Sequence, residues 1–74
     1  MDIDVKKLIR IIESIDVDKL ESLTFKVLIN NLKTTIRYSK DSNKENEVLH
    51  KFNTFCERFK NIQSIQNDLN KYFK

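Results

Sequence analysis

The sequence predicts an all-α protein built as one bundle of four to five helices. Glycine and proline are both absent from the 74 residues, whereas tight β-hairpin turns usually need glycine for its positive φ. Apolar residues recur at helical spacing along three segments, and the segments between them are rich in Ser, Asn and Asp. A chain of this length forms a single domain, here residues 1–74.

Small size limits how such a domain is stabilised. A core of this size supplies only about 3–5 kcal/mol of net stability. Cys56 is the only cysteine, so an internal disulfide is excluded, and one His with one Cys cannot complete a zinc site. We therefore expect no metal or cofactor and a fold that depends on helix packing. No paired carboxylates or activated nucleophile stand out, so we also expect that the protein is not an enzyme.

The first helix is predicted from Val5 to Ile15. Its apolar residues follow one stripe of a 3.6-residue repeat: Val5, Leu8, Ile9, Ile12 and Ile15. Asp4 is placed to accept hydrogen bonds from the first free amides of this helix. A break follows at residues 16–18, where aspartate side chains compete for the backbone.

A second helix is predicted to begin near Ser22 or Thr24 and to end at about Tyr38. Five of its residues should face the core: Phe25, Leu28, Ile29, Leu32 and Ile36. Residues 39–43 are polar and form the clearest loop. Ser42, with Glu45 three residues later, has the pattern of a capping box and predicts the start of the next helix.

The strongest periodicity lies in the C-terminal part of the chain. Its stripe alternates in steps of four and three: Val48, Phe52, Phe55, Phe59, Ile62, Gln66, Leu69 and Phe73. Leu49, Cys56 and Ile65 lie beside this stripe. We expect one helix that continues at least to Ile62, with a break near Ser64 as the alternative and residues 63–74 as a helical extension.

This stripe allows two interpretations. Sustained over several heptads, the spacing is typical of a coiled coil, which would make the chain an oligomerisation or assembly protein, for instance a viral one. Phenylalanine holds four of the eight stripe positions and fits poorly in a dimeric coiled coil, whereas rings fill the space between helices of a bundle. We favour the core of a monomeric bundle. Cys56 is then a buried, inert thiol, and His50, off the stripe, is exposed to solvent.

The net charge of +3 is unevenly distributed. Residues 22–44 carry five basic side chains: Lys26, Lys33, Arg37, Lys40 and Lys44. A solvated face explains them, and a nucleic-acid surface or a surface for an acidic peptide are the functional alternatives. Tyr38 is the one aromatic residue near this group, which gives little support for base stacking. No apolar run approaches the roughly 20 residues of a membrane span, so a soluble intracellular protein with no membrane partner is expected.

Four stretches resemble the N-terminal domain of transcription elongation factor TFIIS, and more closely the related integrase-binding domain of lens epithelium-derived growth factor. Residues 4–9 resemble the opening of the family's first helix, and Leu23-Thr24 the start of its second. Residues 32–38 resemble its basic-aromatic stretch, and residues 55–62 its final helix. The resemblance covers about residues 3–62.

This resemblance implies a right-handed helical bundle that acts as a docking scaffold in nuclear transcription complexes. Such domains bind short linear motifs of disordered partners, commonly an aromatic residue with acidic flanks. Carried over to this sequence, the partner-binding residues are Ile3, Asp4, Arg37, Tyr38 and Lys40. An aromatic anchor would lie between Ile3 and Tyr38, and basic side chains at the rim would meet its acidic flanks. Lys26, Lys33 and Lys44 would add a basic surface.

Overall fold

A computed structural model describes residues 4–40 and 43–73, and these residues form only helices and their connections. The elements follow in the order α1 (Val5–Ser14), a short 3-10 turn η1 (Val17–Lys19), α2 (Leu23–Tyr38), α3 (Lys44–Phe59) and α4 (Gln63–Tyr72). The predicted all-α bundle is therefore confirmed. Ile3, one of the residues predicted to bind a partner, lies outside the described residues.

Helix α1 forms as the apolar stripe predicts. Asp4 is its N-cap, and the carboxylate Oδ1 accepts from the amide of Lys6 at 3.0 Å. Leu8 and Ile12 are fully buried, and Ile15 follows the helix as a buried C-cap residue. The predicted break at residues 16–18 is the 3-10 turn η1, which Asp16 caps by accepting from the amide of Asp18 at 3.1 Å.

Helix α2 has the predicted bounds. Ser22 is its N-cap, and its hydroxyl accepts from the amide of Phe25 at 3.2 Å. The core side of the helix buries Phe25, Ile29 and Leu32. After Tyr38 the chain turns into α3, for which Asn43 is the N-cap residue. The predicted cap, Ser42, lies outside the described residues, and Glu45 lies in the first turn of α3.

The predicted continuity of the third helix to Ile62 is wrong. Helix α3 ends at Phe59, and Ile62 has an extended backbone (φ −87°, ψ 121°) as the N-cap residue of α4. The Gln66 side chain donates its Nε2 hydrogen to the carbonyl of Lys60 in the corner between α3 and α4. It thus satisfies a backbone carbonyl group instead of interrupting an apolar stripe. The corner also turns Ile65 into the core, where it is fully buried, and leaves Ile62 43% exposed.

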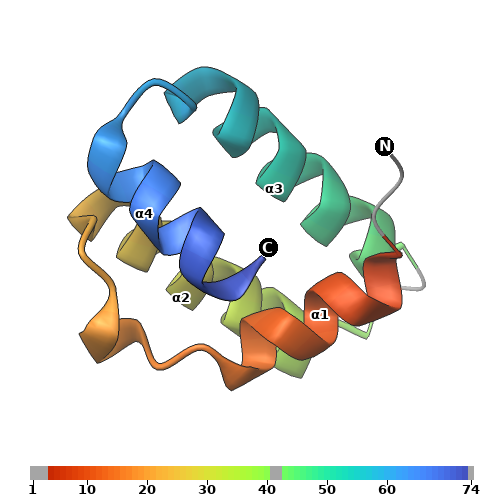
Figure 1. Ribbon diagram of the computed structural model, residues 1–74. Helices are drawn as coiled ribbons and strands as arrows, with labels where there is room; N and C mark the ends of the chain where they lie inside the picture. Colours follow the sequence, from red (N-terminus) through yellow and green to blue (C-terminus); the bar gives the residue numbers. More distant parts are fainter. Residues whose placement is uncertain (1–3, 41–42, 74) are drawn as a thin grey trace.

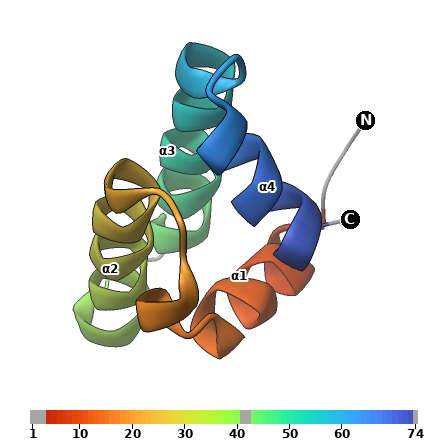
Figure 2. The ribbon, with the colours of Figure 1, turned by 60° about the vertical axis from the view of Figure 1, so that its left-hand side comes forward.

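Helices α2 and α3 run side by side in opposite directions, and α1 and α4 both lie on one side of this pair (Figures 1 and 2). The pairs α1–α3, α2–α3 and α1–α2 pack closely, and η1 packs against α2. The folded chain measures 34 × 27 × 18 Å along its principal axes. These dimensions are those of a compact bundle and not of an extended rod.

The phenylalanines meet in one cluster within the core. Phe25 of α2 lies 5.7 Å from Phe55 of α3 and 6.5 Å from Phe73, measured between ring centroids. Phe73 is 4.9 Å from Phe52, and Phe59 is 4.8 Å from Phe55. Tilted and edge-on contacts of this kind add to the stabilisation from burial alone. The expectation that the rings fill space between helices of a bundle is confirmed.

One buried carboxyl group joins α4 to the start of α2. Asp68 is 1% exposed, and its two oxygens accept from the amides of Glu21 and Ser22 at 3.0 and 2.9 Å. Beside it, the Asn67 amide donates to the Glu21 carboxylate at 3.1 Å. The free amides ahead of a helix need acceptors, and the positive end of the helix dipole favours negative charge there. Asp68 supplies both from a helix 46 residues away in the sequence.

Asp68→Ala should lower the free energy of unfolding by about 2–4 kcal/mol, because it leaves the buried amide of Ser22 and the partly buried amide of Glu21 without acceptors. Asp68→Asn, which keeps one oxygen acceptor, should cost about half as much. Urea denaturation followed by circular dichroism measures both variants, with Asn67→Ala as the neighbouring control that changes stability by less than about 0.5 kcal/mol. Equal stability of Asp68→Ala and Asn67→Ala would contradict this assignment.

Candidate functional site

An open groove runs between α2 and α3 on the side of the pair opposite α1 and α4. Its volume is about 680 Å³. Five lining residues come from α2 and six from α3: Leu23, Thr24, Val27, Leu28, Asn31, His50, Lys51, Thr54, Phe55, Arg58 and Phe59. We refer to these residues as the α2–α3 groove.

The apolar part of the α2–α3 groove is open to solvent. Leu23 is 73% exposed and Val27 62% exposed, one helical turn apart on α2. Phe55 forms the floor with 9% exposure, and Phe59 is half-buried beside it. Single exposed apolar residues are ordinary on protein surfaces, but a continuous apolar strip in a groove is typical of an interaction site.

The rim of the groove on α3 is basic. Lys51 and Arg58 line it, whereas no Asp or Glu does so among the described residues. Lys51 forms an exposed ion pair with Glu47 at 3.1 Å, which offsets part of its charge. Arg58 forms no ion pair within the described residues. The groove therefore presents apolar surface next to the charge of Arg58, which no ion pair among the described residues offsets, and next to the partly offset charge of Lys51.

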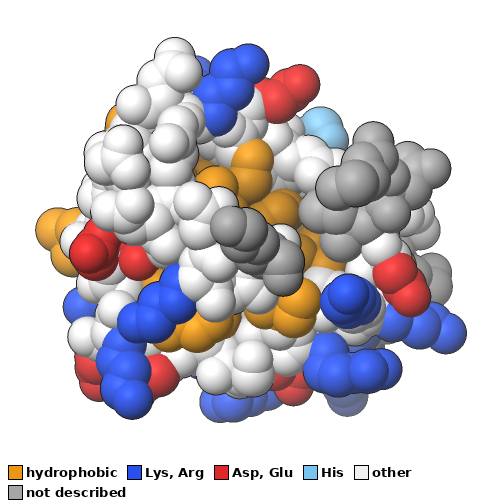
Figure 3. Space-filling view, viewed as in Figure 1, with side chains coloured by type: hydrophobic (Ala, Val, Ile, Leu, Met, Phe, Trp, Pro, Cys, Tyr) orange, Lys and Arg blue, Asp and Glu red, His pale blue; other side chains and the backbone are white. Residues whose placement is uncertain are grey.

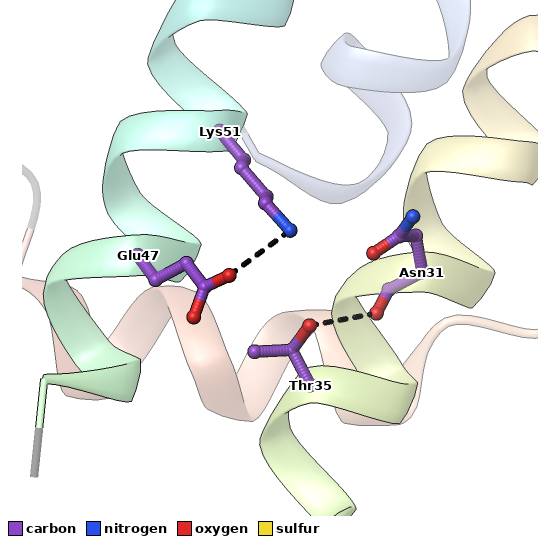
Figure 4. A network of polar contacts seen from close by, with 4 residues as sticks. All are labelled: Asn31, Thr35, Glu47 and Lys51. Atoms are coloured by element: carbon purple, nitrogen blue, oxygen red, sulfur yellow. Dashed lines mark hydrogen bonds and ion pairs between the residues drawn. The ribbon is translucent and has the colours of Figure 1, made fainter. Parts of the chain in front are cut away.

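One end of the groove is polar. Figure 4 shows Glu47 and Lys51 of α3 pointing across the gap toward Asn31 and Thr35 of α2. The Thr35 hydroxyl donates to the carbonyl of Asn31 at 3.1 Å, so it is occupied within its own helix. The apolar strip thus lies between this polar end and the corner after Phe59.

The partner-binding residues predicted from the sequence are only partly brought together. Arg37 and Tyr38 lie in the last turn of α2 and line a separate hollow of about 280 Å³ with Lys33. Tyr38 is 71% exposed, and Lys40 follows in the exposed loop. Asp4 serves as the N-cap of α1, so its carboxylate has a structural role. This hollow is less than half the volume of the α2–α3 groove.

Two of the three lysines predicted to add a basic surface have structural partners. Lys33 donates from its Nζ to the carbonyl of Ile15, where α1 ends, and Lys44 donates to the carbonyl of Ile36 at 3.5 Å. Lys26 is half-buried on α2. On the face shown in Figure 3, Lys and Arg side chains lie mostly along the lower border, below a group of hydrophobic side chains. Lys33 and Lys44 thus donate hydrogen bonds to carbonyl groups near the ends of helices and also carry charge.

Sequence reasoning missed the groove because it searched each helix for one apolar stripe. Leu23 and Val27 are spaced by one turn on the side of α2 away from Phe25 and Ile29. This second pair of apolar residues was the available signal. Leu23 and Val27 lie in the same groove as Lys51 and Arg58 because of the way α2 packs against α3. The spacing of residues within one helix does not reveal this.

Other site chemistry gains no support from the described residues. They contain no group of three or more His, Cys, Asp or Glu side chains that could hold a metal ion. None of their helices has the length and apolar character needed to cross a membrane. His50 is exposed at the rim of the groove, as expected. In comparisons with protein-family models, curated proteins and solved structures, nothing matches this chain.

Cys56 is half-buried beside the core, and burial raises the pKa of its thiol. Because the thiolate is the reactive form, the folded protein should react with a disulfide reagent such as DTNB more slowly at pH 8 than the urea-unfolded chain. Because burial disfavours the thiolate, the fold should lose stability as the pH rises from the ordinary thiol pKa through the raised folded-state pKa. Equal reaction rates in the two states would contradict the burial of this thiol.

Proposed function

We propose that this protein is an interaction module that binds short linear motifs with acidic and aromatic or aliphatic residues. The observation that supports this function best is the α2–α3 groove, an exposed apolar strip beside Arg58 and Lys51. Binding would bury Leu23 and Val27 against an apolar anchor, which supplies most of the free energy. The basic rim would orient acidic residues of the motif and speed association.

The affinity expected for such a motif is micromolar. A disordered segment loses conformational entropy when it becomes ordered, and this offsets much of the gain from burying a few anchor side chains. A dissociation constant near 1 μM corresponds to about −8 kcal/mol. Such an interaction is reversible and suits a scaffold that recruits partners.

The family resemblance adds a cellular setting to this proposal. Residues that resemble the N-terminal domain of TFIIS suggest docking in transcription or chromatin-associated complexes and hence a nuclear location. The same resemblance places the motif at Arg37, Tyr38 and Lys40 instead of the α2–α3 groove. The two locations lie on different parts of α2, so substitutions can distinguish them.

Val27→Asp should weaken binding of an acidic-aromatic peptide at least about tenfold, since it puts a carboxylate into the apolar strip and repels the acidic flanks. Asn53→Asp is the matched control, because it adds the same charge to an exposed position of α3 that lines neither the groove nor the hollow. Both titrations are followed by NMR with labelled protein. Equal affinities of the two variants would exclude the groove as the binding site.

Arg58→Glu and Arg37→Glu form a second matched pair, with the same change of charge in the groove and in the hollow predicted from the sequence. We expect Arg58→Glu to weaken peptide binding and to reduce its dependence on salt, whereas Arg37→Glu leaves both nearly unchanged. The reverse result would assign the motif to Arg37 and Tyr38.

The other proposed activities predict different results in the same samples. An assembly protein would sediment as a stable dimer or higher oligomer without any peptide. A nucleic-acid-binding domain would bind an oligonucleotide with an affinity that falls steeply with salt and is lost when Lys26, Lys33 and Arg37 are changed to Ala. Either finding, together with no peptide binding, would contradict the docking function.

A further inference from the structure

We infer that the motif binds in the α2–α3 groove as a short amphipathic helix, which packs as an additional helix of the bundle, with acidic side chains seven residues apart facing α3. This inference rests on the proposed docking function and specifies the conformation and register of its ligand. Three features support it: the spacing of the lining residues, the hydrogen bonding of the backbone around them and the positions of Lys51 and Arg58.

The walls of the groove are ridges of residues spaced by four. On α2 the sequence of the wall is Leu23, Val27 and Asn31, with Thr24 and Leu28 beside it. On α3 the ridges are His50, Thr54 and Arg58, with Lys51, Phe55 and Phe59 beside them. Ridges of this spacing are complementary to the side-chain rows of another helix, which is how helices pack in globular proteins. The opposite side of the same pair already carries α1 and α4 (Figure 2).

The backbone around the groove favours a helical ligand over an extended one. Most of the lining residues lie inside α2 or α3, where amide and carbonyl groups bond within the helix, whereas Leu23 and Thr24 begin α2 and Arg58 and Phe59 end α3. An extended peptide would find no strand edge to pair with and would place its own amides and carbonyls over Val27 and Phe55 without partners. Unpaired backbone groups are costly to bury, whereas a helix satisfies them internally.

The length of the lining sets the length of the ligand. Leu23 to Asn31 covers eight residue steps on α2, or about 12 Å along the helix axis. A helix of about two to three turns fills this distance, and apolar residues at positions i, i+4 and i+7 would form one side of it. These side chains would contact Leu23, Val27 and the exposed edge of Phe59.

The two cations set the positions of the acidic residues. Lys51 and Arg58 are seven residues apart on α3, which places them on the same side of the helix about 10 Å apart along its axis. Acidic side chains seven residues apart on the ligand match this spacing. The acid opposite Arg58 should contribute more, because Glu47 already offsets the charge of Lys51.

The charges also disfavour a second copy of this chain as the ligand. A symmetric pair of α2–α3 grooves would bring two sets of Lys51 and Arg58 into one interface, and no Asp or Glu of the lining is available to neutralise them. Like charges placed close together across an interface oppose association. An acidic partner gains from the same cations.

The test uses the full chain, four capped peptides of about 12 residues and a version of the first peptide with lysine in place of the facing glutamate. The first has apolar residues at i, i+4 and i+7 and glutamates seven apart on one flank. The second has the same composition in a permuted order that spreads the apolar residues around the helix. The third carries proline at its centre, and the fourth is a proline-rich acidic peptide. Affinity is measured by calorimetry, and the site by NMR shifts of α2 and α3 amides.

We expect the first peptide to bind in the groove and the second and third to bind at least about tenfold more weakly, because both lose the helical apolar face. Arg58→Glu should weaken the first peptide, and exchanging the facing glutamate of the peptide for lysine should restore binding. Leu23→Ser and Val27→Ser should remove binding without loss of helicity, since both residues are exposed.

Three results would overturn all or part of the inference, and they are distinguishable. If the proline-containing or proline-rich peptide binds the groove as tightly as the first, the ligand is not helical, while the docking function stands. If no peptide shifts the resonances of α2 and α3, both the helical ligand and the docking function at this groove are wrong. Failure of the lysine exchange to restore binding to Arg58→Glu would contradict the proposed register.

Discussion

The arrangement of the helices depends on the two hydrogen bonds that Asp68 accepts from the amides of Glu21 and Ser22. A buried carboxyl group is costly unless its oxygens are satisfied, and amides ahead of a helix are costly unless they have acceptors. Here the carboxylate oxygens and the two amides satisfy each other. Asp68 therefore fixes where α4 lies relative to the start of α2, and Ile65 and Phe73 then complete the core.

The position of α4 also determines which surface remains open. Helices α1 and α4 cover the same side of the α2–α3 pair, so the phenylalanine cluster forms there and the opposite side has no helix among the described residues (Figure 2). That opposite side is the α2–α3 groove. The stabilising core and the candidate binding surface are thus two sides of the same pair of helices, and Phe55 contributes to both.

Helix bounds within the first half of the chain could be predicted closely, because they depend on local signals. Asp4 and Ser22 cap the helices that follow them, and the spacing of the apolar residues predicts the buried sides of α1 and α2. The corner at residues 60–62 could not be predicted in this way, since the stripe through Ile62 and Gln66 is compatible with a continuous helix. It forms because Gln66 satisfies the Lys60 carbonyl and because Ile65 and Asp68 gain partners on distant helices.

The amino-acid order was sufficient to predict the class of the fold, the bounds of α1 and α2 and the buried residues of these two helices. Capping, turn composition and periodicity act over a few residues and leave a record in the order of amino acids. The role of Asp68 and the proximity of Leu23 and Val27 to Arg58 became visible when the helices were packed, because both depend on distances between helices that are far apart in the chain. The sequence does not show which residues of another helix lie beside an exposed leucine or arginine, because that depends on how the helices pack.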